Sequence, residues 1–171
     1  MKSKKLQKRI FIVSTSPIPI YLFLKNHINQ LHKYYHISLI TNTSSTILSD
    51  KKVNFDDFYF IPIKRKIHIL YDLYCLIYLT LIFFTKKPDL IWNVNPKAGL
   101  LGAISSYICK INSLFVFQGE VWANKKSFSR LILKECDKIL IKLTKNVFAV
   151  SNGEKIFLDK EMNINKKKIK V

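Results

Sequence analysis

Short β-rich runs alternate with longer helical runs along the whole chain, and this alternation constrains the fold more than any other feature. The expected strands are Ile10–Thr15, His36–Thr41, Phe58–Ile63, Leu90–Val94, Ser113–Phe117, Asn146–Val150 and Ile169–Val171. The expected helices are Tyr21–Tyr34, Ile67–Phe84, Lys97–Ile108, Lys126–Lys145 and Gly153–Met162, with a polar loop over Asn42–Ser49. Strands that alternate with helices of this length favour a parallel sheet with right-handed crossovers. The sequence therefore predicts an α/β domain with a Rossmann-like, doubly wound parallel sheet.

The composition indicates one folded domain in a reducing compartment. The 171 residues fall within the roughly 100–200 residues of a typical domain, and a hydrophobic share of 49% excludes a disordered basic tail. The cysteines Cys75, Cys109 and Cys136 lie far apart and form no C-x-x-C pair. This pattern excludes a disulfide scaffold and a thiolate zinc site, and it fits a reducing compartment.

The charge balance predicts an anionic partner other than nucleic acid. Lys and Arg number 29 against 11 Asp and Glu, which gives a formal net charge of +18. Arg9, Arg65 and Arg130 are the only arginines, whereas proteins that read nucleic acid usually depend on the planar arginine fork. The lysine excess therefore favours a membrane surface or a lipid phosphate over nucleic acid.

Basic residues recur at every fourth position of the expected helix over 126–145. They form one slowly turning stripe of Lys126, Arg130, Lys134, Lys138 and Lys142. The apolar residues expected to face the core from the opposing positions are Phe128, Ile132, Cys136, Ile139 and Leu143. The basic stripe is either a solvated face or a contact with anionic lipid, to which each basic residue near the surface contributes about 1 kcal/mol.

The most apolar stretch, Ile67–Phe84, is expected to pack against the sheet rather than to cross a bilayer. His68 and Asp72 interrupt it, which leaves an uncharged run over Leu73–Thr85. That run is shorter than the ~20 residues that a spanning helix needs, and a helix that is apolar on nearly every side is usually buried. The apolar run over 10–13 is likewise too short for the core of a secretory signal.

The turns that follow the expected strands are the candidate ligand sites, because ligands of an open parallel sheet bind outside the carboxyl ends of its strands. These turns are 14–16, 95–99, 118–122 and 151–153, and all but the first contain a glycine. Glycine allows a positive φ or a close approach of the backbone to a ligand. The turns form either a binding site or ordinary connections between strands and helices.

Two of these turns carry residues suited to binding an anion or to acid–base chemistry. Pro96 opens an expected helix and leaves free backbone N–H groups beside Lys97, an arrangement that attracts anions. Neither a G-K-[ST] P-loop nor a G-x-G-x-x-G dinucleotide motif is present. Glu120 is either a general base or an ordinary surface residue. Trp122 either stacks on a sugar ring or fills the edge of the domain.

Metal and hydrolytic chemistry have no support in the sequence. The histidines and cysteines lack the spacing of metal ligands, and no H-E-x-x-H or D-x-D motif is present. A G-x-S-x-G nucleophile elbow is also missing. We therefore expect neither a metal ion nor a cofactor.

Two segments carry a family resemblance that extends over nearly the whole chain. They are KPDLIWNVNPKAGLLGAISSYI at 87–108 and FVFQGEVWANKKSFSRLILKECDKILIKLTKNVFAVSNGEKIFL at 115–158. Both resemble the N-terminal half of GT-B glycosyltransferases of the family-4 retaining type, which serve bacterial capsule, exopolysaccharide and O-antigen assembly. Many relatives carry a histidine where this chain has Gln118. Relatives also continue beyond the position of Val171 into a second Rossmann-like domain, which binds the nucleotide-sugar and carries an E-x7-E motif.

The resemblance implies roles for residues on the predicted turns. The residues implied in binding the acceptor or its phosphate are Ser14, Asn95, Lys97, Gly99, Gln118, Gly119, Trp122 and Ser151. Glu120 is implied as the catalytic residue of the reacting region. The donor would be a nucleotide-sugar held by the second domain, and the acceptor a lipid-linked saccharide.

The resemblance also implies partners and a location. The chain is expected on the cytoplasmic, inner face of the plasma membrane, bound to an anionic lipid surface and completed by a separate donor-domain chain. As half a transferase, it is expected to be inactive alone. The alternative is a noncatalytic, membrane-associated subunit of a split GT-B transferase, of the Alg14 type, that recruits a donor-domain chain. In that case the surface over Leu73–Phe84 would contact the membrane or the partner.

Overall fold

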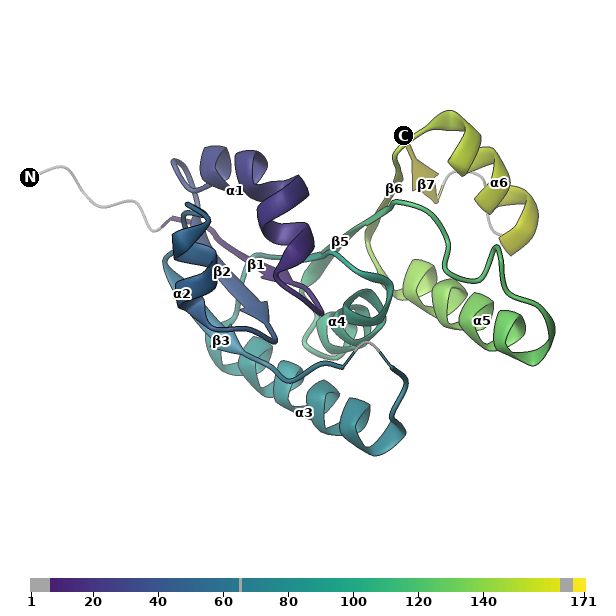
Figure 1. Ribbon diagram of the computed structural model, residues 1–171, viewed down its shortest axis with the longest axis horizontal. Coiled ribbons are helices and arrows are strands. Elements are labelled where there is room, and N and C mark those ends of the chain that lie inside the picture. The colour runs from purple at the N-terminus through teal and green to yellow at the C-terminus, as the bar shows by residue number, and fades with distance from the viewer. Residues whose placement is uncertain (1–6, 65, 164–167) are drawn as a thin grey trace, which may run out of the picture.

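The computed structural model describes residues 7–64, 66–163 and 168–171, which form a seven-stranded sheet with helices on both faces (Figure 1). The strands are β1 (Arg9–Val13), β2 (His36–Thr41), β3 (Asp57–Phe60), β4 (Leu90–Asn93), β5 (Asn112–Phe117), β6 (Asn146–Ala149) and β7 (Ile169–Lys170). The helices are the π-helix η1 (Ile20–Leu24), α1 (Lys25–Leu31), α2 (Ser45–Asp50), α3 (Ile69–Lys86), α4 (Pro96–Ile108), α5 (Ser127–Leu143) and α6 (Asn152–Met162). This architecture confirms the predicted α/β fold with a Rossmann-like, doubly wound sheet.

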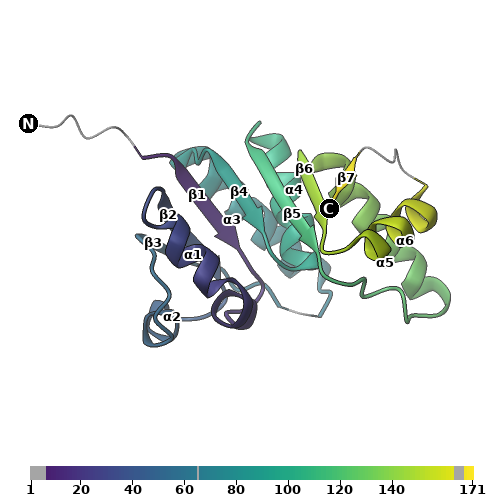
Figure 2. The ribbon, with the colours of Figure 1, turned by 90° about the horizontal axis from the view of Figure 1, so that it is seen from above.

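The strand order β3-β2-β1-β4-β5-β6-β7 reverses between β1 and β4. Val13 of β1 lies opposite Asn93 of β4 on one side and opposite Ile40 of β2 on the other. Neighbouring strands are parallel throughout, so their carboxyl ends share one edge of the sheet (Figure 2). An open sheet of this kind binds ligands at the reversal, so the ends of β1 and β4 mark the expected position of a site.

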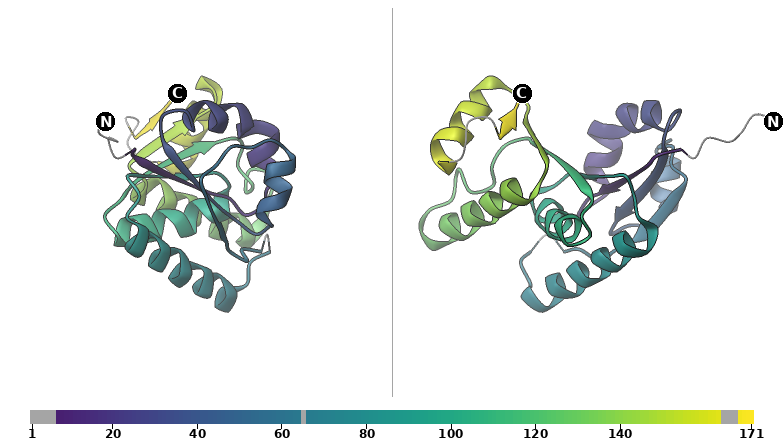
Figure 3. Two further views of the ribbon diagram at one scale, coloured as in Figure 1. Left: turned by 90° about the vertical axis from the view of Figure 1, so that its left-hand side faces the viewer. Right: turned by 180° about the vertical axis from the view of Figure 1, so that it is seen from behind.

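Alternate residues of the central strands face opposite layers of helices, as the pleat requires. Ile12 of β1 packs in one cluster with Ile20 of η1. Phe11 packs in another cluster with Phe83 of α3 and Leu101 of α4. In the second layer α3 lies against α4, and α4 lies against α5 (Figure 3). These three helices therefore share one side of the molecule, and η1 and α1 lie on the other.

The short helix α2 begins within the segment predicted as a polar loop over Asn42–Ser49 and ends just beyond it, at Asp50. Leu48 of this helix is fully buried and belongs to the same cluster as Ile12. The loop prediction was wrong because the local residues are polar, whereas one buried leucine docks the helix onto the sheet. Tertiary contact thus overrides local propensity here.

Helix α3 is apolar on both its inner and its outer face, and only the inner face is buried. It begins after His68, whose Nδ1 accepts a hydrogen bond from the backbone N of Tyr71 at 3.4 Å. The side chains buried against the core are Cys75, Leu79, Ile82 and Phe83. The outward side chains that are exposed are Ile69, Leu70, Leu73, Tyr74, Ile77, Tyr78, Leu81 and Phe84. The expected burial of this stretch against the sheet therefore holds for one face only.

By length and composition, α3 is the helix among the described residues that is long and apolar enough to cross a membrane. Only 22% of its residues are buried in the domain. The expectation that it does not span a bilayer stays a prediction.

Helix α5 packs through a different face from the one predicted. Its buried residues are Asp137, Leu140 and Ile141. The predicted core residues Phe128, Ile132 and Ile139 are instead exposed, and Cys136 and Leu143 are half-buried. A spacing of four residues drifts around a helix with 3.6 residues per turn, so the basic stripe did not locate the opposite face. The placement of Phe128, Ile132 and Ile139 in the core was wrong.

Candidate functional site

The ends of β1 and β4 are tied together by the side chain of Asn95. Its Oδ1 accepts hydrogen bonds from Ser14 Oγ at 2.5 Å and from the backbone N of Thr15 at 2.9 Å. Ser14 is fully buried and Thr15 nearly so. The carboxyl edge is therefore closed by polar groups at the point where the strand order reverses.

The first turn of α4 has free backbone donors because Asn95 does not cap it. Asn95 precedes the helix in an extended conformation, and its side chain makes no capping bond. Pro96 occupies the first position of the helix and has no N–H group. The N–H groups of the next residues point toward the edge of the sheet, where the helix dipole favours an anion.

Lys97 points away from this turn and toward α3. Its Nζ lies 2.6 Å from Oδ1 of Asp72, and both side chains are mostly buried. The same Nζ donates a hydrogen bond to the backbone oxygen of Lys66 at 2.6 Å. Lys97 therefore ties the first turn of α4 to the first turn of α3, and an incoming anion would have to compete with Asp72 for it.

Glu154 joins the turn after β5 to the turn after β6. Its carboxylate accepts hydrogen bonds from the backbone N of Gly119 at 2.6 Å and of Val150 at 2.8 Å. Its own backbone N donates to Ser151 Oγ at 3.1 Å, so Ser151 caps α6. Gly119 has a φ of +95°, which explains the glycine at this position. Ser151 and Gly119 thus belong to one hydrogen-bonded unit.

Glu120 follows Gly119 and has one carboxylate oxygen, Oε1, that is buried without a hydrogen-bond partner among the described residues. Partial burial raises the pKa of Glu120 above its ordinary value, and the nearby charge of Glu154 raises it further. A raised pKa makes the carboxylate a stronger base toward the hydroxyl group of a bound molecule.

Trp122 fills the edge of the domain, as one of the two alternatives from the sequence expects. It is fully buried, and its Nε1 donates a hydrogen bond to Oδ2 of Asp137 at 2.8 Å. Its ring stacks on Phe157 of α6 with a centroid distance of 5.6 Å. On α5, Cζ of Arg130 lies 5.7 Å and Nζ of Lys134 lies 5.5 Å from the ring centroid of Trp122. Trp122 thereby fixes the turn after β5 to α5 and α6.

Asp137 was not anticipated from the sequence. Burial raises its pKa to about 6, and the hydrogen bond from Trp122 partly opposes this rise. The separation of Trp122 and Asp137 along the chain follows no motif, whereas the Ser151-x-x-Glu154 spacing of a capping box could have revealed Glu154. Asp72 also escaped notice, because in the sequence it only interrupts an apolar run.

Gly99 has a packing role. A Cβ atom at this position would lie 2.6 Å from the ring of Phe115 and 2.7 Å from Leu140. The glycine therefore lets α4 approach β5 and α5 closely. We expected a glycine here because of contact with a ligand, whereas the structure gives it a role in packing.

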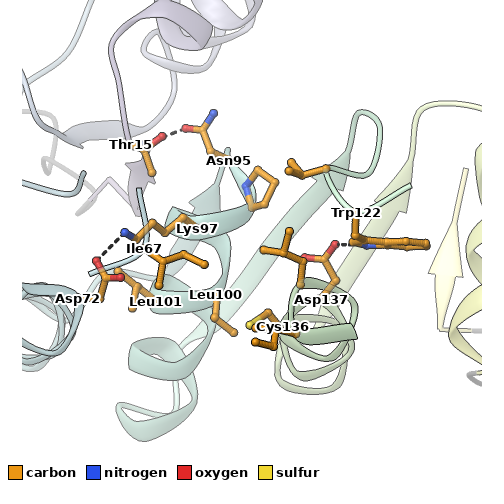
Figure 4. Close-up of a pocket in the computed structure, with 14 residues that line it drawn as sticks. Thr15, Ile67, Asp72, Asn95, Lys97, Leu100, Leu101, Trp122, Cys136 and Asp137 are labelled. Carbon is orange, nitrogen blue, oxygen red and sulfur yellow. Dashed lines mark hydrogen bonds and ion pairs between the residues drawn. The ribbon is translucent and has the colours of Figure 1, made fainter. Parts of the chain in front are cut away.

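A groove of about 410 Å³ lies between the first turns of α3 and α4 and the helix α5 (Figure 4). The apolar residues that line it are Ile67, Pro96, Leu100, Leu101, Val121, Trp122, Ile132, Leu133 and Cys136, and the polar ones are Thr15, Asp72, Asn95, Lys97 and Asp137. The polar groups pair with one another, as Lys97 with Asp72 and Trp122 with Asp137. The walls thus present mainly apolar surface, and Pro96 and Lys97 of the first turn of α4 are among the lining residues.

The expected site residues fall into two groups on the same edge. Asn95, Lys97 and Trp122 line the groove, and Ser14 is bonded to Asn95. Glu120 lies in the second group, around Glu154, with Gly119 and Ser151. The side chain of Gln118 is exposed. No cluster of His, Cys, Asp and Glu able to hold a metal ion occurs among the residues that the structure describes.

The basic stripe on α5 is partly neutralised by neighbouring acids. Arg130 and Lys134 both lie within ion-pair distance of Glu161 on α6, at 3.1 and 2.9 Å. Lys138 lies 2.6 Å from Glu135. Lys126 and Lys142 are exposed. The assignment of the stripe to a membrane contact stays a prediction.

Known proteins resemble the chain in sequence and in fold. No protein-family model matches it. Over 96 residues, 56% of the chain, it is 30% identical to the capsular polysaccharide biosynthesis glycosyltransferase CapM of Staphylococcus aureus, and it covers 25% of that protein. The chain is thus a distant relative of a capsular polysaccharide glycosyltransferase.

Solved structures resemble the fold at low sequence identity. The UDP-GlcNAc 2-epimerase of Methanocaldococcus jannaschii matches 95% of the chain with a TM-score of 0.69 and 21% identity. HepE of Anabaena, solved with UDP, matches 96% with a TM-score of 0.62 and 15% identity. MurG of Acinetobacter baumannii matches 83% with a TM-score of 0.56 and 13% identity. The chain covers between 41% and 44% of these proteins, so it folds as one half of a GT-B-like structure.

Proposed function

We propose that this chain is the acceptor-binding half of a glycosyltransferase that moves a sugar from a nucleotide-sugar to a lipid-linked glycan in capsule, exopolysaccharide or O-antigen synthesis. The sequence similarity to CapM of Staphylococcus aureus carries this proposal. The GT-B-like half fold supports it, since such a half supplies one wall of a cleft.

In this proposal the phosphate of the acceptor lipid lies at the first turn of α4. The free N–H groups after Pro96 supply donors, and Lys97 supplies a charge once it exchanges Asp72 for the phosphate. The apolar groove beside this turn takes the first part of the lipid chain. Glu120 accepts the proton of the acceptor hydroxyl, a role that its raised pKa suits.

Direct binding by the full chain tests the acceptor assignment. We expect a short-chain polyprenyl-diphosphate-linked sugar to bind in calorimetry, and a UDP-sugar to bind much more weakly. Lys97→Ala should weaken acceptor binding by about tenfold to a hundredfold, since a hydrogen bond to a charged group contributes about 1.5–3 kcal/mol. Lys160→Ala, at an exposed position of α6, is the matched control. Tighter binding of the UDP-sugar than of the lipid-linked sugar would overturn the assignment.

The exposed apolar face of α3 favours a second candidate, a noncatalytic membrane-associated subunit that recruits a separate donor-domain chain. The two candidates differ in what Glu120 does. In a pair reconstituted with a donor-domain chain, Glu120→Gln should lower the transfer rate if this half contributes to catalysis. An unchanged rate at equal complex formation favours the noncatalytic subunit.

A further inference from the structure

The outward face of α3 is a continuous apolar surface without a charged side chain. Ile69, Leu70 and Phe84 are 79%, 76% and 67% exposed. Asp72, which interrupts the sequence here, is turned inward to Lys97. Folded monomers rarely expose an apolar patch of more than a few hundred Å² unless it contacts another surface. This face is therefore a candidate docking surface.

The inner face of the same helix is held in the domain along its length. Cys75, Leu79 and Phe83 are fully buried. Thr80 Oγ1 donates a hydrogen bond to Ser105 Oγ of α4 at 3.0 Å. The helix can therefore expose one side to a partner surface without leaving the core, whereas crossing a bilayer would require these contacts to break.

Basic residues flank the apolar face at both ends. Lys64 and Lys66 precede α3 and are exposed, and Lys86 and Lys87 end it and are also exposed. This charge pattern complements an anionic lipid surface, where lysine side chains extend from an apolar face to the head groups.

Tyrosines occupy the same surface. Tyr74 and Tyr78 stack on each other with ring centroids 6.2 Å apart, and both are exposed. Lys64 Nζ lies 4.2 Å from the ring centroid of Tyr71. Tyrosine is enriched at the boundary between membrane and water, because its ring is apolar and its hydroxyl is polar.

We propose that α3 lies in the plane of an anionic bilayer, with its outward face inserted among the head groups. This inference uses a different surface from the α5 stripe and does not rest on the proposed transferase function. Binding at a membrane interface increases with the apolar area that is buried and with attraction to anionic lipid, and the outward face of α3 and its flanking lysines supply these two contributions. A second copy of the chain fits less well, since parallel or antiparallel pairing of two α3 helices brings lysines against lysines at both ends.

Vesicle sedimentation with the full chain tests the proposal. We expect binding to vesicles that contain phosphatidylglycerol and weaker binding to vesicles of phosphatidylcholine alone. The double variant Leu70→Glu/Leu81→Glu should raise the lipid concentration for half-maximal binding about tenfold or more, because it removes two inserted apolar side chains. The control Leu22→Glu/Phe23→Glu makes the same charge change at comparably exposed residues of η1, on the other side of the sheet. The control should bind within about twofold of the unmodified chain.

Equal losses in the two double variants would overturn the proposal, because net charge alone would then explain them. Absence of binding to anionic vesicles by the unmodified chain would overturn it as well. Circular dichroism establishes that each variant is folded, and Leu73→Ser, a milder change on the same face, should weaken binding in the same direction. Retention in the membrane pellet after alkaline carbonate would indicate a spanning helix, and a dimer that Leu70→Glu/Leu81→Glu dissociates would indicate a second copy. Because the vesicles contain no acceptor, these outcomes are independent of the proposed transferase function.

Discussion

At the scale of single residues, buried contacts determine where the turn after β5 lies. Trp122 donates its only polar hydrogen to Asp137, and its ring is held between α5 and α6. Glu154 holds the preceding Gly119 through the backbone. Glu120 lies between these two anchors, so its position depends on both of them.

Asp137 should make stability depend on pH. Its pKa is about 6 in the folded chain and near the ordinary aspartate value of 3.8 in the unfolded chain. The folded state therefore binds the proton more tightly, so this contribution to stability is fully present below pH 4 and is lost as the pH rises toward 6. The loss is on the order of 3 kcal/mol. Asp137→Asn keeps an amide oxygen that can accept the hydrogen bond from Trp122, and it should not show this loss of stability with rising pH.

Urea denaturation at pH 4, 5, 6 and 7 measures this difference. Between pH 4 and 6 the unmodified chain should lose stability relative to Asp137→Asn. Asp50→Asn, at an exposed position of α2, is the control and should follow the unmodified chain. Parallel stability curves for the unmodified chain and Asp137→Asn would contradict the prediction.

Glu154→Gln should change both the turn after β5 and the titration of Glu120. The amide of Gln has one oxygen, so it can accept a hydrogen bond from the backbone N of Gly119 or from that of Val150. The loss of the other hydrogen bond should cost about 1 kcal/mol of stability. The pKa of Glu120 should fall, because a nearby negative charge is removed. Carboxyl-carbon NMR titration of Glu120 is the measurement, with Glu135→Gln as the exposed control. A Glu120 titration identical in Glu154→Gln and the unmodified chain would refute the coupling.

At the scale of elements, the strands were predictable to within a few residues and the buried faces of the helices were not. Strands such as β2 carry β-branched residues bounded by polar turns, a signal that is local. The faces of α3 and α5 depend on which neighbours they meet, and α2 depends on one contact of Leu48. Such information belongs to the tertiary structure, so periodicity alone could not supply it.

The α5 stripe should add an electrostatic part to membrane binding. The basic residues of the stripe that form no ion pair with Glu161 among the described residues are Lys126, Lys138 and Lys142. Their triple substitution by Glu should weaken binding to anionic vesicles and flatten its dependence on salt, since exposed charges are screened within ~8 Å at physiological ionic strength. Sedimentation at low and high salt measures this. An unchanged affinity in the triple variant would exclude the stripe from the contact.

At the scale of the whole molecule, the topology located the candidate site better than the residue types did. The carboxyl edge follows from strand order, and Ser14 and Asn95 do meet there. The roles of Gly99 and Trp122 were harder to foresee, because a packing glycine and a ligand-binding glycine look identical in a sequence. Trp122 likewise packs in the core, although it also borders the groove.

The isolated chain should transfer no sugar. In our proposal residues 1–171 supply one wall of the cleft, and without a second wall to position the nucleotide-sugar they forfeit a proximity contribution of several kcal/mol, up to roughly 7–11. Adding a donor-domain chain should restore transfer to a lipid-diphosphate-linked acceptor. Glu120→Gln and Lys97→Ala should each lower that rate without unfolding the domain. A radiolabelled nucleotide-sugar and membrane extract provide the assay, and transfer by the chain alone would show this prediction to be wrong.

The ion pair between Asp72 and Lys97 has a geometric consequence for any membrane-bound state. It places the first turn of α3 beside the first turn of α4, at the carboxyl edge of the sheet. Because α3 connects two parallel strands, its axis runs roughly opposite to theirs. With α3 flat on the lipid, the strands would run along the membrane, and the groove beside the first turn of α3 would be held close to the head groups. A lipid-borne molecule would then reach it by diffusing in two dimensions, without being lifted out of the bilayer.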